Sequence, residues 1–142
     1  MKRFASYTLY TLLLAAIACA CSDRLDITQN YDFEFRTMPY PARIIQGETI
    51  EIRCEIVTAG NYAGTQFFIR YFQTDGKGEL RLDDGRILTP NDLFPLTNLV
   101  FRLYYTSHTT ERQNLDVYIE NNFGRVVQKS FSFANETPKN EE

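Results

Sequence analysis

The chain of 142 residues has no tryptophan, one histidine and three cysteines, so the residue types that build most catalytic and metal sites are scarce. His108, the single histidine, lies in a polar stretch and is expected in a solvated loop. With so few histidines and cysteines, the sequence offers no recognisable zinc site and no Ser-His-Asp order. The glycines flank apparent strands and do not open a helix, which argues against a phosphate-binding loop. We therefore predict no catalytic residue, no metal site and no cofactor.

Basic clusters and amphipathic helices are also missing. The chain carries 15 Lys and Arg against 18 Asp and Glu, for a net charge of -3. The basic residues are scattered among acidic ones and form no stripe that could displace counterions from DNA. Nucleic acid is therefore not expected as a partner.

The first 21 residues are predicted to be an export signal. Lys2 and Arg3 precede an apolar run from about Tyr7 to Ala20 that ends in small residues. As a helix of about 14 residues, the run would span roughly 21 Å, against about 30 Å for the hydrocarbon core of a bilayer. It is too short for a transmembrane anchor.

A cysteine directly follows a small residue at the end of this run, in the order Ala16-Ile17-Ala18-Cys19-Ala20-Cys21-Ser22-Asp23. The pattern resembles a bacterial lipoprotein box, whose cysteine receives acyl chains that anchor the protein stably. We favour Cys21 over Cys19 for lipidation because polar residues begin directly after it. An ordinary secretory signal with incidental cysteines is the alternative. The expected location is the cell envelope of a Gram-negative bacterium, lipid-anchored, with the outer membrane favoured and its face left open.

Cys54 would be the one unmodified cysteine after processing at Cys21, so no internal disulfide is expected. From Ile50 to Ile56 the apolar residues share one parity with Cys54, and the charged residues share the other. Cys54 is therefore predicted to be a buried small hydrophobe. A reactive thiol would need an exposed, electropositive setting.

The rest of the chain is predicted to form strands, because apolar residues alternate and Gly, Pro, Asn and Asp occupy the breaks. Residues 22–30 are expected to form a tether before a domain at 31–134, and residues 135–142 lack apolar side chains and should be disordered. The expected strands lie near Tyr31–Arg36, Thr49–Val57, Thr65–Gln73, Glu79–Leu82, Arg86–Leu88, Leu99–Thr106, Asn114–Glu120 and Arg125–Ala134.

About seven short strands with frequent turns favour an all-β, immunoglobulin-like Greek-key β-sandwich, with a small open barrel as the alternative. The strands near residues 31, 49 and 99 are assigned to one sheet, and those near 65, 114 and 125 to the other. The turns Asp75–Gly78, Asp83–Gly85 and Asn121–Gly124 are predicted to join adjacent antiparallel strands. Pro39 and Pro41 interrupt the first strand, where the chain is expected to reach an edge or change sheets.

Two aspartates precede Gly85 and invite a functional interpretation. Asp83 and Asp84 could form a carboxylate pair for acid-base chemistry, or bind calcium together with Asp75. Turn formation is the simpler interpretation, and we adopt it.

Aromatic residues occupy both parities of the segment Phe67-Phe68-Ile69-Arg70-Tyr71-Phe72, so one set must leave the core. We predict that Phe68, Arg70 and Phe72 face outward beside Tyr118 on the neighbouring strand. Aromatic and arginine side chains are typical of interface centres, so we hypothesise a contact with a partner protein there. Alternatively, the N-terminal segment or the loop at residues 93–96 simply covers these rings.

Four segments together resemble the TraQ proteins of Bacteroides-type conjugative transposons: Gly47–Cys54, Ile69–Gly78, Phe101–Ser107 and Asp116–Gly124. The resemblance extends from about Asp23 to Ala134, although the two cysteines near the cleavage site depart from the single cysteine expected in the family. It implies a structural or scaffolding lipoprotein whose partners are proteins of the conjugation apparatus, and it transfers no catalytic residue or defined ligand.

A surface-exposed module that binds glycan or host protein is the alternative function, because β-sandwiches serve many purposes. Gene neighbours separate the two: a transfer ATPase and channel subunits would favour conjugation, and glycan-import genes the alternative. An enzyme ranks third and would require a deep pocket with perturbed titrating groups.

Overall fold

The computed structural model describes residues 31–60 and 63–139, which form nine strands and no helix. None of these residues belongs to a helix that could cross a bilayer. The lipidation site predicted at Cys21, its alternative Cys19, the tether at 22–30 and the last residues of the tail lie outside the described residues. The strands are β1 (Phe33–Thr37), β2 (Arg43–Ile44), β3 (Thr49–Thr58), β4 (Phe67–Asp75), β5 (Gly78–Leu82), β6 (Phe94–Leu96), β7 (Val100–Ser107), β8 (Gln113–Asn121) and β9 (Val126–Asn135).

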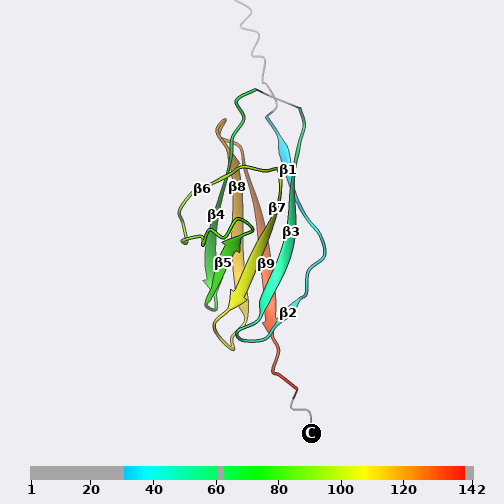
Figure 1. Ribbon diagram of the computed structural model, residues 1–142, viewed down its shortest axis with the longest axis vertical. Coiled ribbons are helices and arrows are strands. Elements are labelled where there is room, and N and C mark those ends of the chain that lie inside the picture. The colour runs from blue at the N-terminus through cyan, green and yellow to red at the C-terminus, as the bar shows by residue number, and fades with distance from the viewer. Residues whose placement is uncertain (1–30, 61–62, 140–142) are drawn as a thin grey trace, which may run out of the picture.

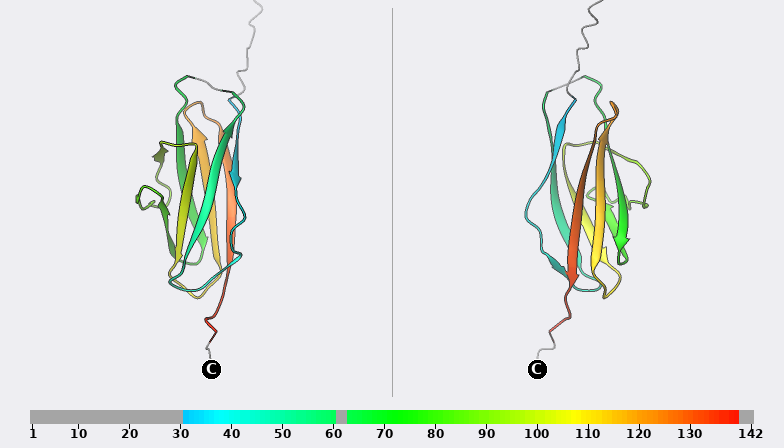
Figure 2. Two further views of the ribbon diagram at one scale, coloured as in Figure 1. Left: turned by 45° about the vertical axis from the view of Figure 1, so that its right-hand side comes forward. Right: turned by 180° about the vertical axis from the view of Figure 1, so that it is seen from behind.

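The strands lie in two sheets packed face to face (Figures 1 and 2). Sheet A has the order β1-β3-β7-β5, and sheet B has the order β2-β9-β8-β4-β6. Every pairing between neighbours is antiparallel except that of β2 with β9, which is parallel. An all-β sandwich and the predicted division of strands between two sheets are thereby confirmed, and the described residues do not form the open barrel.

The core between the sheets is formed by every second residue of the strands, because buried and exposed side chains alternate along them. Along β3 the exposed and buried residues alternate from Thr49 to Ile56, and along β8 every second residue from Gln113 to Asn121 is buried. Cys54 is 2% exposed, as predicted from its parity. The inner faces contribute Phe33, Phe35, Ile50, Ile52, Ile56, Leu80, Leu82, Phe101, Leu103 and Tyr105 from sheet A, and Ile44, Phe67, Ile69, Tyr71, Leu115, Val117, Ile119, Phe131 and Phe133 from sheet B.

The turn Asp75–Gly78 does not join neighbouring strands, so this part of the prediction is wrong. β4 ends at Asp75 in sheet B, and β5 begins at Gly78 in sheet A, where Gly78 lies opposite Ser107 of β7. The turn therefore crosses one end of the sandwich. Gly76, with φ of +77°, marks where the chain reverses, but turn chemistry does not determine which sheet the next strand joins.

The strand predicted at Arg86–Leu88 is reduced to one bridge between Ile87 and Arg81. The turn Asp83–Gly85 does return the chain antiparallel to β5, but the chain then turns away, with Asn91 at a φ of +68°. The third predicted turn, Asn121–Gly124, joins the paired strands β8 and β9 as expected.

Two short strands, β2 and β6, were not predicted. β2 follows the segment with Pro39 and Pro41, across which the chain leaves sheet A and joins sheet B beside β9. The predicted change of sheet at these prolines is confirmed. β6 lies in the segment expected to be a loop and forms the edge of sheet B beside β4.

Candidate interaction face and end cleft

The outer surface of sheet B carries the predicted aromatic and arginine patch, which we call the interaction face: Phe68, Arg70, Phe72 and Tyr118. All four side chains are half-buried, and they come from the adjacent strands β4 and β8. Arg70 lies opposite Tyr118 in the register of these strands. The rings of Phe72 and Tyr118 meet edge to face, with centroids 5.7 Å apart and an interplanar angle of 86°. The edge-to-face arrangement is one that aromatic pairs in proteins commonly adopt. The four predicted residues therefore lie on one outer surface of two adjacent strands.

Arg70 lies at the centre of the interaction face. Its Cζ is 6.0 Å from the centroid of the Phe72 ring and 5.7 Å from that of Tyr118, within the range of cation-π attraction. Its Nη2 lies 3.4 Å from Oε2 of Glu120, and 30% of the Arg70 side chain is exposed to solvent. Its Nε is buried and has no hydrogen-bond partner among the described residues. Within the described part of the chain, one donor of the guanidinium is thus unsatisfied.

The outer surface of sheet A has a different character. Arg36 pairs with Glu34 at 2.6 Å, and Glu51 lies 3.1 Å from Arg102 and 3.5 Å from Arg53. These are exposed ion pairs of the kind that contribute little to stability and keep a surface solvated. Sheet B is therefore the better candidate for a protein contact.

The alternative interpretation, in which the loop at residues 93–96 covers the interaction face, is only partly supported. The segment at residues 93–96 contributes β6, which extends sheet B at the edge of β4 and places Pro95 opposite Phe68. β6 continues the sheet beside the face, so its pairing does not place it over Arg70 and Phe72. The N-terminal segment before Tyr31 lies outside the described residues.

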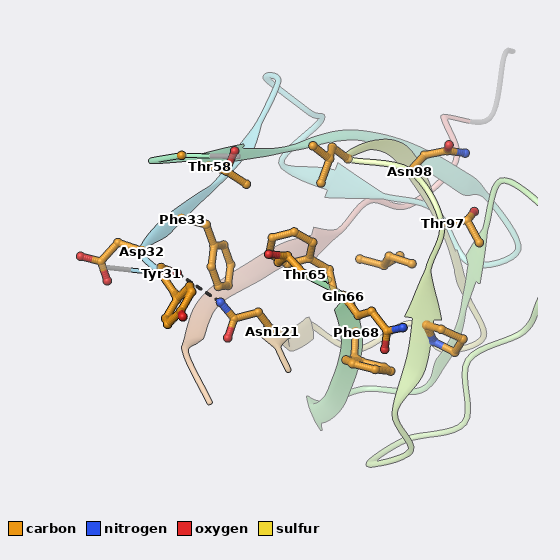
Figure 3. Close-up of a pocket in the computed structure, with 15 residues that line it drawn as sticks. Tyr31, Asp32, Phe33, Thr58, Thr65, Gln66, Phe68, Thr97, Asn98 and Asn121 are labelled. Carbon is orange, nitrogen blue, oxygen red and sulfur yellow. Dashed lines mark hydrogen bonds between the residues drawn. The ribbon is translucent and has the colours of Figure 1, made fainter. Parts of the chain in front are cut away.

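A second feature, the end cleft, was not predicted from the sequence (Figure 3). It is a hollow of about 480 Å³ at the end of the sandwich where the described chain begins. Apolar side chains line it from both sheets and from the segment between β6 and β7: Phe33, Phe67, Phe68, Pro95, Leu96 and Leu99. Polar side chains also line it: Asp32, Thr58, Thr65, Gln66, Thr97, Asn98 and Asn121. The lining comes from segments far apart in the chain, so no local pattern could have indicated it.

Asn121 holds one wall of the end cleft in place. Its Nδ2 donates to the carbonyl oxygen of Tyr31 at 3.1 Å, and its Oδ1 accepts from the backbone N–H groups of Phe123 and Arg125 at 3.1 and 2.9 Å. Tyr31 also stacks on Phe123 at a centroid distance of 3.8 Å. The first described residue is therefore fixed to the turn between β8 and β9.

The titratable residues that the sequence analysis considered, Cys54, Asp83, Asp84 and His108, lie outside these two features. Burial raises the pKa of the Cys54 thiol to about 12, so it stays protonated at neutral pH. Asp84 accepts from the backbone N–H of Arg86 at 3.0 Å, which lowers the pKa of that carboxyl, and Asp83 accepts from the N–H of Arg102 at 3.3 Å. His108 is exposed in a loop. In the part of the chain that the structure describes, no three His, Cys, Asp or Glu side chains gather as a metal site would require.

Comparison with protein families shows a match over residues 4–136 to the model of the TraQ conjugal transfer protein. The chain belongs to the TraQ family. This agrees with the resemblance carried by the four segments around residues 47–54, 69–78, 101–107 and 116–124. A comparison with curated proteins gives no match.

Solved structures similar to the chain support the same family. A lipoprotein from Bacteroides thetaiotaomicron is 50% identical over 84% of this chain and 92% of its own, with a TM-score of 0.71. A conjugative transposon lipoprotein from Bacteroides eggerthii is 43% identical over 72% of this chain and 97% of its own, with a TM-score of 0.69. A conjugate transposon protein from Bacteroides vulgatus, solved as residues 27–141, is 46% identical over 78% of this chain and 90% of its own, with a TM-score of 0.66. Solved structures similar to this TraQ family member are thus named as lipoproteins and transposon proteins.

Proposed function

We propose that this TraQ family member is a non-catalytic, lipid-anchored envelope protein that binds a protein of the conjugation apparatus through the interaction face. The observation that carries the proposal is the half-buried cluster of Phe72, Tyr118 and Arg70 on the outside of sheet B. Such side chains dominate the binding energy at protein interfaces when a partner excludes water from them. The Arg70 side chain is 30% exposed, so the accessible part of its guanidinium can also donate to a carbonyl or carboxylate of a partner.

Lipidation at Cys21 supports the envelope location within this proposal, because two similar structures are named lipoproteins. We favour the outer membrane and leave its face open. Mass spectrometry of the protein from envelope fractions should find an acylated N-terminal cysteine at position 21. An unmodified N-terminus, or acylation at Cys19, would contradict this part of the proposal.

We infer further that the sandwich is a variant of the immunoglobulin-like Greek key. The order β1-β3-β7-β5 corresponds to the A-B-E-D sheet of that fold, and β9-β8-β4 to its G-F-C sheet. β2 and β6 add an edge strand to each side of the second sheet. The chain departs from that fold in the sequence order of two strands: β5, which corresponds to strand D, comes before β6, the edge strand that pairs with β4. Proton contacts in NMR between Gly78 and Ser107, together with contacts between Phe67 and Leu96, would verify this order.

The test of the interaction face is the substitution Phe72→Asp with Tyr104→Asp as a matched control. Tyr104 is also a half-buried aromatic residue at the middle of a strand, and its ring lies 5.4 Å from Cζ of Arg81, but it is on the outer surface of sheet A. Each full-length variant is expressed in donor cells that lack the native gene. Transfer frequency, envelope level, thermal unfolding and co-purification of apparatus subunits are then measured.

Phe72→Asp should lower transfer frequency and abolish co-purification of an apparatus protein while unfolding within about 10 °C of the native protein, because the lost ring contacts are worth about 1–2 kcal/mol. Tyr104→Asp should unfold similarly and leave transfer unchanged. Equal effects of both variants on transfer, or unfolding of Phe72→Asp at growth temperature, would show that the cluster serves stability and not binding.

A further inference from the structure

The end cleft combines an apolar interior with a polar rim whose one carboxylate is paired, and we propose that it binds a large apolar side chain presented by an uncharged, extended segment of a partner protein. The cleft shares Phe68 with the interaction face but is otherwise lined by other residues, and it is tested separately. Its volume of about 480 Å³ lies within the ordinary range for ligand sites, about 300–1,000 Å³. Leu99, 44% exposed at its mouth, adds apolar surface that the isolated chain leaves in water.

Charge restricts the class of ligand. Among the described residues that line the cleft, Asp32 is the one carboxylate, and its Oδ1 lies 2.7 Å from Nε of Arg125. The pair leaves no uncompensated charge to attract an ion, and a charged ligand would lose its hydration against Phe33, Phe67 and Leu96. The occupant is therefore uncharged where it enters the cleft.

The geometry of the aromatic rings in the end cleft favours an apolar side chain over a sugar as the ligand. Phe33 and Phe67 meet edge to face, at 5.1 Å between centroids and 79° between planes, and they are 6% and 7% exposed. One face of Tyr31 is covered by Phe123. A pyranose ring is usually held by stacking on an open aromatic face, and these rings are packed against one another. An aromatic or branched aliphatic side chain can instead fill the hollow that these rings line together with Leu96 and Leu99, as in the centre of a protein interface.

The rim of the end cleft fits the backbone of such a segment. Thr58, Gln66, Thr97 and Asn98 are exposed residues of the lining and carry hydroxyl and amide groups (Figure 3). Hydroxyl and amide side chains both donate and accept, so they match the alternating N–H and C=O groups of an extended chain. Phe68 belongs both to this lining and to the interaction face, so one partner could continue from one site to the other.

The position of the end cleft indicates where the partner segment lies. Tyr31 lines the cleft, and the nine residues 22–30 separate it from Cys21. The ten Cα-to-Cα steps from Cys21 to Tyr31 span at most about 33–36 Å when fully extended. If Cys21 carries lipid, as proposed above, Tyr31 lies within that distance of the bilayer, and the partner segment has to reach the cleft there.

The test is an NMR titration of the ¹⁵N-labelled polypeptide 22–142, which begins directly after the proposed lipidation site, with three blocked probes. N-acetyl-L-phenylalaninamide carries an apolar side chain between two amides, N-acetyl-L-lysinamide replaces it with a charge, and N-acetylglucosamine represents a sugar. The phenylalanine probe should shift the amides of Thr58, Gln66 and residues 96–98 and saturate on the order of 1 mM, as its size allows. The other two probes should bind at least about tenfold more weakly.

The matched variants are Leu99→Lys and Val100→Lys. These neighbours are both exposed and apolar, at 44% and 68%, but only Leu99 lines the cleft. Leu99→Lys should weaken the phenylalanine probe at least about tenfold, and Val100→Lys should leave its affinity within about twofold. Unshifted cleft amides, tighter binding of the sugar or lysine probe, or equal effects of the two variants would overturn the proposal. None of these results depends on whether Phe72→Asp affects transfer, so the two proposals can fail separately.

Discussion

A buried polar network at the end of the sandwich opposite the end cleft gives the sharpest prediction about stability. Tyr105 is 0% exposed, and its hydroxyl donates to Oε1 of Gln113 at 2.5 Å and accepts from Nε2 of Gln73 at 3.0 Å. Gln113, also 0% exposed, donates from its Nε2 to Oγ1 of Thr109 at 2.7 Å. Gly78 lies so close to Tyr105 that an added Cβ would clash with the hydroxyl. The network thereby holds the turn that carries the chain from sheet B to sheet A.

Tyr105→Phe removes the hydroxyl and leaves Oε1 of Gln113 with a single weak donor, Nε2 of Gln73 at 3.4 Å. A buried acceptor left in this way costs about 1–3 kcal/mol. Gly78→Ala should cost about 1–3 kcal/mol as well, because the methyl group has to displace Tyr105 or the carbonyl of Thr106. The double variant should lose about 1 kcal/mol less than the sum of the two. Removing the Tyr105 hydroxyl removes one of the three atoms that the added methyl group would meet and releases the ring from its hydrogen bonds, so that the ring can move away, while the carbonyl of Thr106 remains in the way.

Urea and thermal unfolding of the four proteins measure these costs. For a domain of about 100 residues, each kcal/mol lowers the Tm by about 4 °C or more, so each single variant should lose about 4–15 °C. The variant Thr106→Ala, at an exposed hydrogen bond between Thr49 and Thr106, serves as the control and should change the Tm by less than about 3 °C. A loss below about 0.5 kcal/mol for Tyr105→Phe, or strict additivity in the double variant, would refute the network as described.

Four further outcomes are expected. The Cys54 thiol should react with a thiol reagent at least about 10³-fold more slowly in the native protein than in urea, because it is exposed only on unfolding; an equal rate would contradict its burial. Folding raises the pKa of this thiol from 9.0 to about 12, so between these pH values the thiol ionises in the unfolded protein and stays neutral in the folded one. The contribution of the neutral thiol to stability is therefore complete below pH 9 and is lost as the pH rises toward 12. Cys54→Ala should remove this part of the loss of stability at alkaline pH, as measured by urea unfolding. Asn121→Ala should cost about 1–3 kcal/mol and broaden the NMR signals of residues 122–125, whereas unchanged signals would show that its hydrogen bonds are not needed. Ile44→Ala, at a side chain 0% exposed in β2, should cost about 2–5 kcal/mol in urea unfolding, and a loss below about 1 kcal/mol would mean that β2 contributes little to the core.

Strands with an unbroken period of two were predictable, and so were the residues that they bury. In β3 and β8 each buried apolar residue has at least one charged or polar neighbour, so one face was expected to enter the core, and Cys54 and Val117 are buried accordingly. The interaction face followed from the same rule. Phe72 and Tyr118 share outward parity with Arg70 and Glu120, and pairing of β4 with β8 brings them together.

The parts that could not be predicted depend on packing between distant segments. The turn at Gly76 has the chemistry of a hairpin, yet Leu80 and Leu82 find their buried positions in sheet A beside β7. β2 and β6 are two and three residues long and carry too few positions to show a period. The end cleft requires the ends of β1, β4 and β6 to meet, which only the assembled sandwich provides.

The edges of the two sheets explain why a partner should bind the face and the cleft and not add a strand. At β6, Pro95 has no N–H to offer, and its carbonyl oxygen accepts from Nη2 of Arg86 at 2.8 Å. At β5, the carbonyl of Leu80 and the N–H of Leu82 are already bonded to the returning segment 86–88. In β9, Lys129 lies on the same side of the strand as the buried residues Phe131 and Phe133. A charged side chain that points inward at a sheet edge disfavours the pairing of a further strand there. Three of the four sheet edges are obstructed in this way, and the edge of β1 is the exception. Obstruction at β5, β6 and β9 favours binding at the half-buried aromatic cluster and the apolar hollow beside it over addition of a strand at those edges.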